Sequence, residues 1–355
     1  MRVIRRYMFR AILGSTGLVL AVLLGLAVFI EFVTQLDDLG TGDYGIVQAI
    51  AYSFLKLPNL AHQMLPMAVL LGSLLGLGGL ANHGELVIIR AAGVSMYRLA
   101  GAVTMTGVIL ALVTLVIGEY IGPPLDNYAR QFRAEAKHAG QPVTTGQSAW
   151  IRDGNTYLNV SRLTDDFRLG GIFLYKISPD GQLEGIGRAD SAGVDAANQW
   201  VLSNYEESSF TGNGVKTMKA RRSTQANNLS PDLVSLTVVR PDGLSGAELW
   251  RYVQYLKRNE LDAGTYELAF WSRIAAAVAV APMCVLALPF VFTRMRSSGA
   301  GARMVIGLAV GLAYFLVSRG LSDGGQVYDL EPVVMAWLPT GALMLATLIA
   351  LMRTR

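Results

Sequence analysis

Cysteine, histidine and charged residues are all scarce in this chain of 355 residues. Cys284 is the only cysteine, which excludes an intramolecular disulfide framework and a cysteine-rich zinc site. The three histidines, His62, His83 and His138, lie too far apart in the sequence to form a local metal-binding motif. Charged residues make up 16% of the chain and hydrophobic residues 52%, whereas an average soluble domain is about 25% charged. These values exclude a disordered chain and an ordinary soluble enzyme, and they indicate segments that span a bilayer.

Motifs of the common catalytic classes are also missing. The chain has no G-x-x-x-x-G-K-[ST] phosphate-binding loop, because no glycine directly precedes any of its lysines. It has no G-x-S-x-G nucleophile motif, no H-E-x-x-H zinc motif and no Cys–His pair. We therefore expect a transporter, a membrane-bound interaction protein or a sensor, with no catalytic residue, no metal and no cofactor bound by the chain itself.

Long apolar runs are abundant and fall into two groups of three. A helix that crosses ~30 Å of hydrocarbon needs about 20 mostly apolar residues. The first run is too long for a signal peptide, and no small-x-small cleavage site follows it, so we expect it to be retained. In the second run, Gly72 and Gly76 form a G-x-x-x-G pattern, for which packing within the chain is the simpler explanation. The expected spans are Ala11–Phe32, Leu57–Leu80, Leu99–Ile121, Leu268–Phe292, Met304–Leu321 and Val333–Met352.

Charges in the loops predict which side of the membrane each loop faces, because Lys and Arg are retained on the cytoplasmic side. With a cytoplasmic N-terminus, the inner segments contain a single acid, Glu85, and many arginines. These arginines are Arg2, Arg5, Arg6, Arg10, Arg90, Arg98, Arg294, Arg296, Arg303, Arg353 and Arg355. The acids of the short outer loops are Asp37, Asp38, Asp43, Asp323, Asp329 and Glu331. We therefore predict cytoplasmic N- and C-termini and an extracytoplasmic insert between the third and fourth spans.

This insert is predicted to consist mainly of β structure. Two hairpins are expected, with turns at Asp153–Asn155 and Pro179–Gly181, because these turn-forming residues separate strand-like runs. Shorter strands are expected near Gln199–Tyr205 and Val215–Ala220, and many short strands with frequent turns indicate a sandwich or a jelly roll. Helices should flank the β region, over Asp126–Lys137 and after Ser245, which is a suitable N-cap.

The inner loop between the second and third spans is the most informative segment. Asn82 and Glu85 have the spacing of a capping box, and Gly93 is well placed as a C′ terminator. We therefore expect a short cytoplasmic helix over residues 82–93. Such a helix is marginal in water and must dock on its own protein, on the membrane or on a partner. Glu85 either stabilises only the helix N-terminus, through the helix dipole, or faces a partner.

Five segments carry a resemblance to a known family. They are Leu65–Gly78, Gly84–Gly93, Gly118–Pro123, Ala129–Ala134 and Leu256–Tyr266 running into Trp271 and Ser272. They resemble the permeases of the lipopolysaccharide-export ABC transporter, the LptF/LptG family, with the LptG half the closer match, and the similarity covers essentially the whole chain. It implies an α-helical integral membrane protein with six transmembrane helices in 3+3 order and a periplasmic all-β jelly-roll insert. The implied domains are residues 1–137 with the inner helix, 138–244 as the jelly roll, and 245–355.

The resemblance also implies a function and a set of partners. The chain would be a permease subunit that extracts lipopolysaccharide from the outer leaflet of the bacterial inner membrane and delivers it to a periplasmic bridge toward the outer membrane. ATP hydrolysis, with Mg²⁺, would take place in two cytosolic LptB-type ATPase subunits. The other partners would be a second, LptF-type permease half, a membrane-anchored LptC-type bridge protein and a soluble LptA-type bridge protein, with no nucleic acid.

Roles for individual residues follow from the same resemblance. The inner helix would couple to the ATPase, and the first and fifth spans would line the lipid cavity. Arg130 and Arg133 lie three residues apart on one helical face and would bind lipid phosphates, because guanidinium suits phosphate. Ion pairing within the β insert is the alternative for both arginines. The ATPase-coupling residues would be Glu85, Leu86, Ile89 and Arg90, and the cavity residues Phe29, Glu31, Phe32, Leu316 and Arg319.

One position departs from the family pattern. Family members can carry a basic residue near the outer end of the first span, where this chain has Glu31. An acid there would repel phosphate, so a cationic clamp on this span is not expected, and Arg319 could supply the positive charge instead.

Two other functions are open from the sequence. A secondary transporter would place ionisable residues near the membrane midplane, whereas the charges here lie toward the span ends. A membrane scaffold or sensor with a periplasmic interaction domain would need neither an inner coupling helix nor a glycine-rich span.

Overall fold

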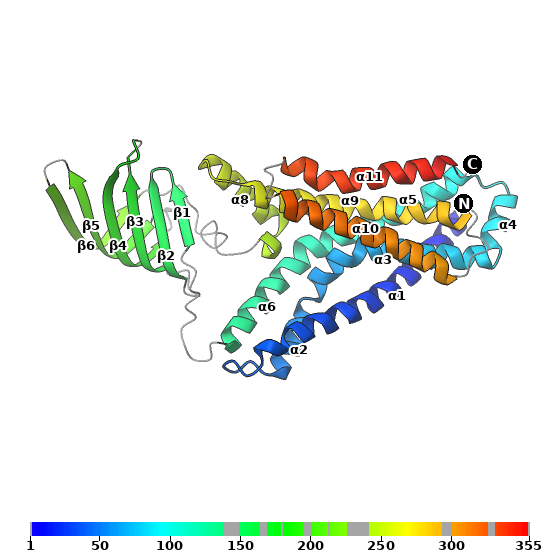
Figure 1. The fold of residues 1–355 in the computed structure, drawn as a ribbon, viewed down its shortest axis with the longest axis horizontal. Coiled ribbons are helices and arrows are strands. Elements are labelled where there is room, and N and C mark those ends of the chain that lie inside the picture. Colours follow the sequence, from blue (N-terminus) through cyan, green and yellow to red (C-terminus); the bar gives the residue numbers. More distant parts are fainter. Residues whose placement is uncertain are drawn as a thin grey trace. The chain divides into compact units, whose positions relative to one another are not determined.

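The computed structural model describes residues 2–137, 149–163, 169–178, 180–194, 200–211, 214–225, 241–292, 300–325 and 331–353 (Figure 1). The chain forms two compact units, which are described separately. The first comprises Met1–Ala139, Ser245–Leu249 and Gly264–Arg355, and the second comprises Gly140–Leu244 and Trp250–Ala263.

Six long apolar helices make up most of the first unit in the part of the chain that the structure describes. They are α1 (Arg2–Thr34), α3 (Leu57–Asn82), α5 (Met96–Val116), α9 (Gly264–Phe292), α10 (Ala300–Gly325) and α11 (Pro332–Arg353). Each contains a window long and apolar enough to cross a membrane. Three of these helices precede the strands in the chain and three follow them. The prediction of a helical membrane protein with six apolar helices is confirmed.

Shorter elements connect the long helices. The turn η1 (Leu36–Asp38) and the helix α2 (Ile46–Leu55) lie between α1 and α3, and α4 (Glu85–Ala91) lies between α3 and α5. One π-turn, η2 (Ile117–Ile121), continues α5 into the polar helix α6 (Gly122–Lys137). The helix predicted over Asp126–Lys137 is thus present, and it continues the third span. Figure 1 shows α4 at the same end of this unit as both chain termini, with α2 at the opposite end.

The helix α3 occupies the centre of the first unit, where it packs against α1, α9 and α10. Its glycines permit the close approach of α1. A Cβ on Gly72 would overlap the backbone of Thr16, and one on Gly76 would lie 2.7 Å from the carbonyl oxygen of Ala11. The G-x-x-x-G pattern therefore serves a contact within the chain, as expected. The helix α10 approaches α3 in the same way, because a Cβ on Gly311 would lie 2.9 Å from Met67.

The second unit contains one antiparallel sheet, in which the strands follow one another in sequence order. The strands are β1 (Ala149–Asp153), β2 (Thr156–Leu163), β3 (Leu169–Ile177), β4 (Leu183–Val194), β5 (Trp200–Thr211) and β6 (Gly214–Gln225). Both predicted hairpins are present, β1–β2 and β3–β4, and Gly154 and Gly181 in their turns have positive φ, which glycine tolerates without strain. The strands β5 and β6 are longer than predicted. The described strands form a single sheet, so the jelly roll stays a prediction.

A polar group lies among the apolar side chains of this sheet. Glu207 on β5 accepts hydrogen bonds from Lys176 Nζ at 2.5 Å and from the Tyr205 hydroxyl at 2.8 Å. Burial of the Glu207 carboxyl favours its neutral form, but these hydrogen bonds outweigh burial and hold the pKa of Glu207 below its ordinary value. Glu207 therefore stabilises the sheet as a carboxylate.

The chain leaves the β region through η3 (Pro241–Gly243) and α8 (Gly246–Arg258). Ser245 caps α8 as predicted, because its hydroxyl accepts the Glu248 N–H at 3.3 Å while Glu248 Oε2 accepts the Ser245 N–H at 2.7 Å. The apolar stripe of this helix is buried. Its members are Leu249, Tyr252, Val253 and Leu256.

Candidate functional site

The inner loop differs from its prediction at the helix start. The helix α3 continues to Asn82, and α4 begins only at Glu85, after Gly84, which has a φ of 77°. The N-cap of α4 is Gly84, which has no side chain to cap the helix, so the prediction of Asn82 as the N-cap of a capping box with Glu85 is wrong. The reason is that the apolar span keeps its own helix to Asn82, and the reversal then takes place at a glycine, which tolerates positive φ.

The end of α4 agrees with the prediction. Gly93 has a φ of 86°, and its N–H donates to the Arg90 carbonyl at 2.9 Å. The N–H of Val94 donates to the Ile89 carbonyl at 3.4 Å. These two bonds are the Schellman arrangement, in which a glycine at C′ satisfies the last carbonyls of a helix.

The predicted coupling residues lie on different faces of α4. Leu86 is fully buried in the helical core, and Ile89 packs against that core. Arg90 places its guanidinium 5.4 Å from the centre of the Phe292 ring at the end of α9. Val87 and Ile88 are exposed, Ile88 by 68%. Leu86, Ile89 and Arg90 therefore hold α4 on its own bundle, and the exposed apolar surface of α4 comes from Val87 and Ile88.

Charged side chains gather where η1 meets the end of α6. Asp38 pairs with Arg133 through one carboxylate oxygen and with Lys137 at 2.6 Å through the other. Arg133 also lies 5.3 Å from the centre of the Tyr52 ring, on α2. One acid of η1 thus holds two bases of α6, and Arg133 contacts both η1 and α2.

Arg130 has a different partner. Its Nε donates to Asp126 Oδ2 at 2.8 Å, one turn earlier on α6, and the Asp126 side chain is fully buried. The acids that pair with the two arginines, Asp126 and Asp38, both belong to the first unit. These contacts do not support the alternative of ion pairing within the β insert. Arg130 and Arg133 share a helix, but they pair with different carboxylates.

Glu31 is part of an ion pair that sequence analysis missed. Its Oε1 accepts from Lys56 Nζ at 2.8 Å, and both side chains are less than a fifth exposed. Lys56 directly precedes the second span, in the first short outer loop, for which only acids were considered in predicting the topology. Lys137 was missed as well, although it lies four residues after Arg133 and so on the same helical face. The acid at position 31 is therefore neutralised by a base at the junction of α2 and α3.

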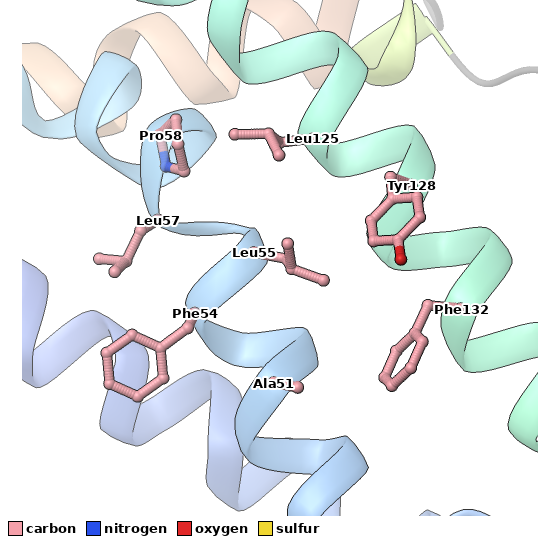
Figure 2. Close-up of a pocket in the computed structure, with 8 residues that line it drawn as sticks. All are labelled: Ala51, Phe54, Leu55, Leu57, Pro58, Leu125, Tyr128 and Phe132. Atoms are coloured by element: carbon pink, nitrogen blue, oxygen red, sulfur yellow. The ribbon is translucent and has the colours of Figure 1, made fainter.

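An apolar pocket of about 560 Å³ lies beside these charges, between α2, the start of α3 and α6 (Figure 2). Figure 2 shows Leu125, Tyr128 and Phe132 of α6 on one side and residues of the α2–α3 corner on the other. The remaining lining residues are Ala51, Phe54, Leu55, Leu57 and Pro58. The Tyr128 hydroxyl is the only side-chain polar group among them.

Two of the six apolar helices are less buried than the other four. In their most apolar windows, α1 is 17% buried and α10 is 11% buried, compared with 78% for α3. Phe29 on α1 is 62% exposed and Leu316 on α10 is 58% exposed, while Phe32 is half-buried and Arg319 exposed. These are the first and fifth spans, whose predicted cavity residues thus lie on helices with large apolar surfaces that the chain does not cover.

No cluster of His, Cys, Asp and Glu suited to a metal ion occurs among the described residues. Cys284 is buried in α9, and its sulfur accepts from the Ser73 hydroxyl at 3.2 Å.

Six apolar helices, two of them with large uncovered faces, and a separate β-sheet unit define a polytopic membrane protein of the permease type. A family model described as "Lipopolysaccharide export system permease LptF/LptG" matches residues 6–353. The chain belongs to this family, and the resemblance noted in the sequence is confirmed.

Individual relatives agree with the family match. The chain is 35% identical to the lipopolysaccharide export system permease protein LptG of Escherichia coli K12, over 99% of this chain and 98% of the relative. It is 34% identical to LptG of Haemophilus influenzae, over 94% of each chain. Similarity to the permease protein LptF of Escherichia coli K12 is weaker, 25% over 94% of this chain and 90% of the relative.

Proposed function

We propose that this chain is the G-type permease half of a transporter that extracts lipopolysaccharide from the outer leaflet of the inner membrane and passes it toward the outer membrane. The observation that carries the proposal is the 35% identity to an LptG permease over almost the full length of both chains. The uncovered apolar faces of α1 and α10 support it, because a lipid cavity must be lined by surface that the chain itself leaves open.

The physical task of such a permease is to move acyl chains out of a bilayer. Each buried CH₂ group contributes ~0.8 kcal/mol to membrane anchoring, so a lipid with many acyl chains does not leave spontaneously. A cavity that closes when ATP is hydrolysed can expel such a lipid. We assign the walls of the cavity to α1 and α10, with Phe29, Phe32 and Leu316 as acyl-chain contacts.

The complex requires partners that bind ATP and that complete the lipid cavity, because this sequence has no phosphate-binding loop. An LptF-type half would complete the cavity, and two LptB-type subunits would bind ATP and Mg²⁺. Membrane-anchored LptC-type and soluble LptA-type proteins would form the periplasmic bridge. Contact with the ATPase is assigned to α4, with Glu85 and the exposed Ile88 facing the partner and Leu86, Ile89 and Arg90 transmitting force to the bundle.

The proposed topology has both termini and α4 in the cytoplasm, with three spans before a periplasmic jelly roll and three after it. The arginine-rich inner loops support this orientation. The common location of α4 and both termini at one end of the first unit agrees with it (Figure 1). The proposed domain boundaries remain 1–137, 138–244 and 245–355.

The charged groups at the outer rim are assigned to the lipid headgroup. Arg130 and Arg133 carry guanidinium groups suited to phosphate, and each is held by a carboxylate that a phosphate would displace. The Glu31–Lys56 pair means that a base stands next to the first span even though position 31 is acidic. Arg319 lies on the other cavity helix and is assigned the same role.

Affinity purification from membranes tests the proposal. The tagged chain is expected to bring down a second permease of similar topology and a soluble nucleotide-binding subunit. A Glu85→Ala variant should still insert in the membrane but retain less of the soluble subunit. Purification of the wild-type chain without either partner would refute the assignment.

A further inference from the structure

An unusual turn ends the third span. The helix α5 passes through the π-turn η2, in which the Gly122 N–H reaches back five residues to the Ile117 carbonyl. Isolated π-turns are rare and often mark functional positions. Gly118 in this turn faces His62 so closely that a Cβ would overlap the imidazole ring. The His62 Nδ1 lies 3.1 Å from the Thr114 carbonyl oxygen, and because a carbonyl only accepts, Nδ1 carries the proton.

Glu119 follows in the same turn and reaches a distant part of the chain. Its Oε2 accepts the Gly246 N–H at 2.6 Å, and its Oε1 accepts the Ala247 N–H at 3.0 Å. These are the first two amides of α8, which have no partner within their own helix. A carboxylate at a helix N-terminus is further favoured by the helix dipole, and charge-assisted bonds of this kind are the stronger class.

The sequence of α8 is adapted to this contact. A Cβ on Gly246 would lie 2.6 Å from Glu119 Oε2, so any larger residue would push the carboxylate away. The next amide, that of Glu248, is satisfied locally by Ser245 at 3.3 Å. The helix therefore already has a local cap, and Glu119 provides a second attachment that links α8 to the third span. None of the ion pairs found in the described ranges involves Glu119.

Glu119 and the first turn of α8 lie on either side of the β region in the chain. The helix α6 begins at Gly122, directly after the π-turn, and the first unit continues along α6 to Ala139; the chain returns to this unit at Ser245. Between them lies the whole β region, and α8 then leads to α9, the fourth span. The helices α5 and α9 already pack together inside the bundle, where a Cβ on Gly107 would lie 2.8 Å from Ala281 Cα. Glu119 thus joins the end of the third span to the segment at which the chain returns to the first unit.

We propose that Glu119 is a positioning residue for export, whose carboxylate clasps the first turn of α8 to the π-turn of the third span. When the third span moves, these two hydrogen bonds make the start of α8 move with it. This proposal rests on the proposed function for its role in transport, whereas the clasp itself rests on the contacts above. A carboxylate at the end of an apolar span is costly without a partner, which agrees with a specific use.

The test uses the full transporter, with its partner permease and ATPase subunits, in lipid nanodiscs. Glu119→Ala and Gly246→Ala should raise hydrogen exchange of the Gly246 and Ala247 amides about tenfold, the factor for ~1.4 kcal/mol. Both should lower the amount of lipopolysaccharide released per ATP hydrolysed at least threefold, while ATP hydrolysis continues. Glu119→Gln keeps one acceptor oxygen and the side-chain volume, so it should fall between wild type and Glu119→Ala in both measurements.

Ser245→Ala is the matched control, because it removes the local cap of the same helix and leaves Glu119 in place. It should leave the ratio of lipid released to ATP hydrolysed at the wild-type value. Unchanged exchange of the Gly246 and Ala247 amides in Glu119→Ala would overturn the clasp. Faster exchange with an unchanged ratio would overturn its role in export. A wild-type complex that hydrolyses ATP but releases no lipid would refute the proposed function and this role with it, while the exchange result would still decide whether the clasp exists.

Discussion

Replacing Leu86 with Ala should detach the inner helix from the bundle without unfolding the protein. Leu86 is fully buried, and a buried Leu→Ala change costs about 2–5 kcal/mol. The helix α4 has 7 residues and is not stable alone, so its position depends on such contacts. Losing this packing free energy should therefore undock α4 from the bundle. The bundle itself should stay folded, because α3 keeps its separate contacts with α1, α9 and α10.

Ile88→Ala is the matched control on the same helix. Its side chain is 68% exposed, so truncation should change the stability of α4 by no more than about 0.5 kcal/mol. Under the proposed function, however, Ile88 faces the ATPase. Both variants should therefore retain less ATPase during purification, but only Leu86→Ala should speed hydrogen exchange across residues 85–94.

Hydrogen exchange of the purified complex, followed by mass spectrometry, separates the two cases. If Leu86→Ala exchanged at the wild-type rate in this segment, Leu86 would not be the anchor of α4. If Ile88→Ala exchanged as fast as Leu86→Ala, the division of α4 into a buried and a partner-facing side would be wrong.

Three further predictions concern packing, pH and the outer rim. Gly72→Ala should lower the stability of the detergent-solubilised protein by about 1–3 kcal/mol, because the new methyl group meets the backbone of α1. A methyl group at position 79 would have no neighbour within 4 Å, so Gly79→Ala is the control and should be neutral or stabilising. Equal denaturation midpoints for the two variants would contradict this packing. Glu207 has a depressed pKa, so its contribution to the stability of the β unit is present above the pKa of the unfolded chain and is lost as pH falls through the lower, folded pKa. Glu207→Gln should therefore weaken the pH dependence of stability in acid, measured by circular dichroism, whereas Glu206→Gln at an exposed position should not. Identical acid midpoints in wild type and Glu207→Gln would contradict the assignment. Arg133→Ala should reduce photocrosslinking of lipopolysaccharide at the rim, and undiminished crosslinking would indicate that this arginine serves only its ion pair.

Local patterns predicted much of the fold. The six spans follow from the length of their apolar runs, because an apolar helix is the simplest way to satisfy backbone groups in lipid. The hairpins follow from their turn residues, and the end of α4 follows from Gly93. Each of these features depends on residues close together in the sequence, where spacing carries the information.

Features that join distant residues were not predictable in this way. Asp38 and Arg133 are 95 residues apart, and nothing in the spacing of either assigns its partner. The same holds for Glu119 and the first turn of α8. Even the local prediction at Asn82 was wrong, because the stability of the long apolar helix overrides a short capping pattern. Tertiary packing decides these positions.

The central claim is that this chain is half of an ATP-driven lipopolysaccharide extractor. It is tested most directly in vesicles that contain lipopolysaccharide and the purified complex of this chain with its partner permease and ATPase subunits, with a soluble bridge protein outside as acceptor. Transfer of lipopolysaccharide to the acceptor should require ATP and should fall when Glu85 is replaced by Ala. Transfer that is equal with and without ATP, or that is absent while ATP is hydrolysed, would contradict the account.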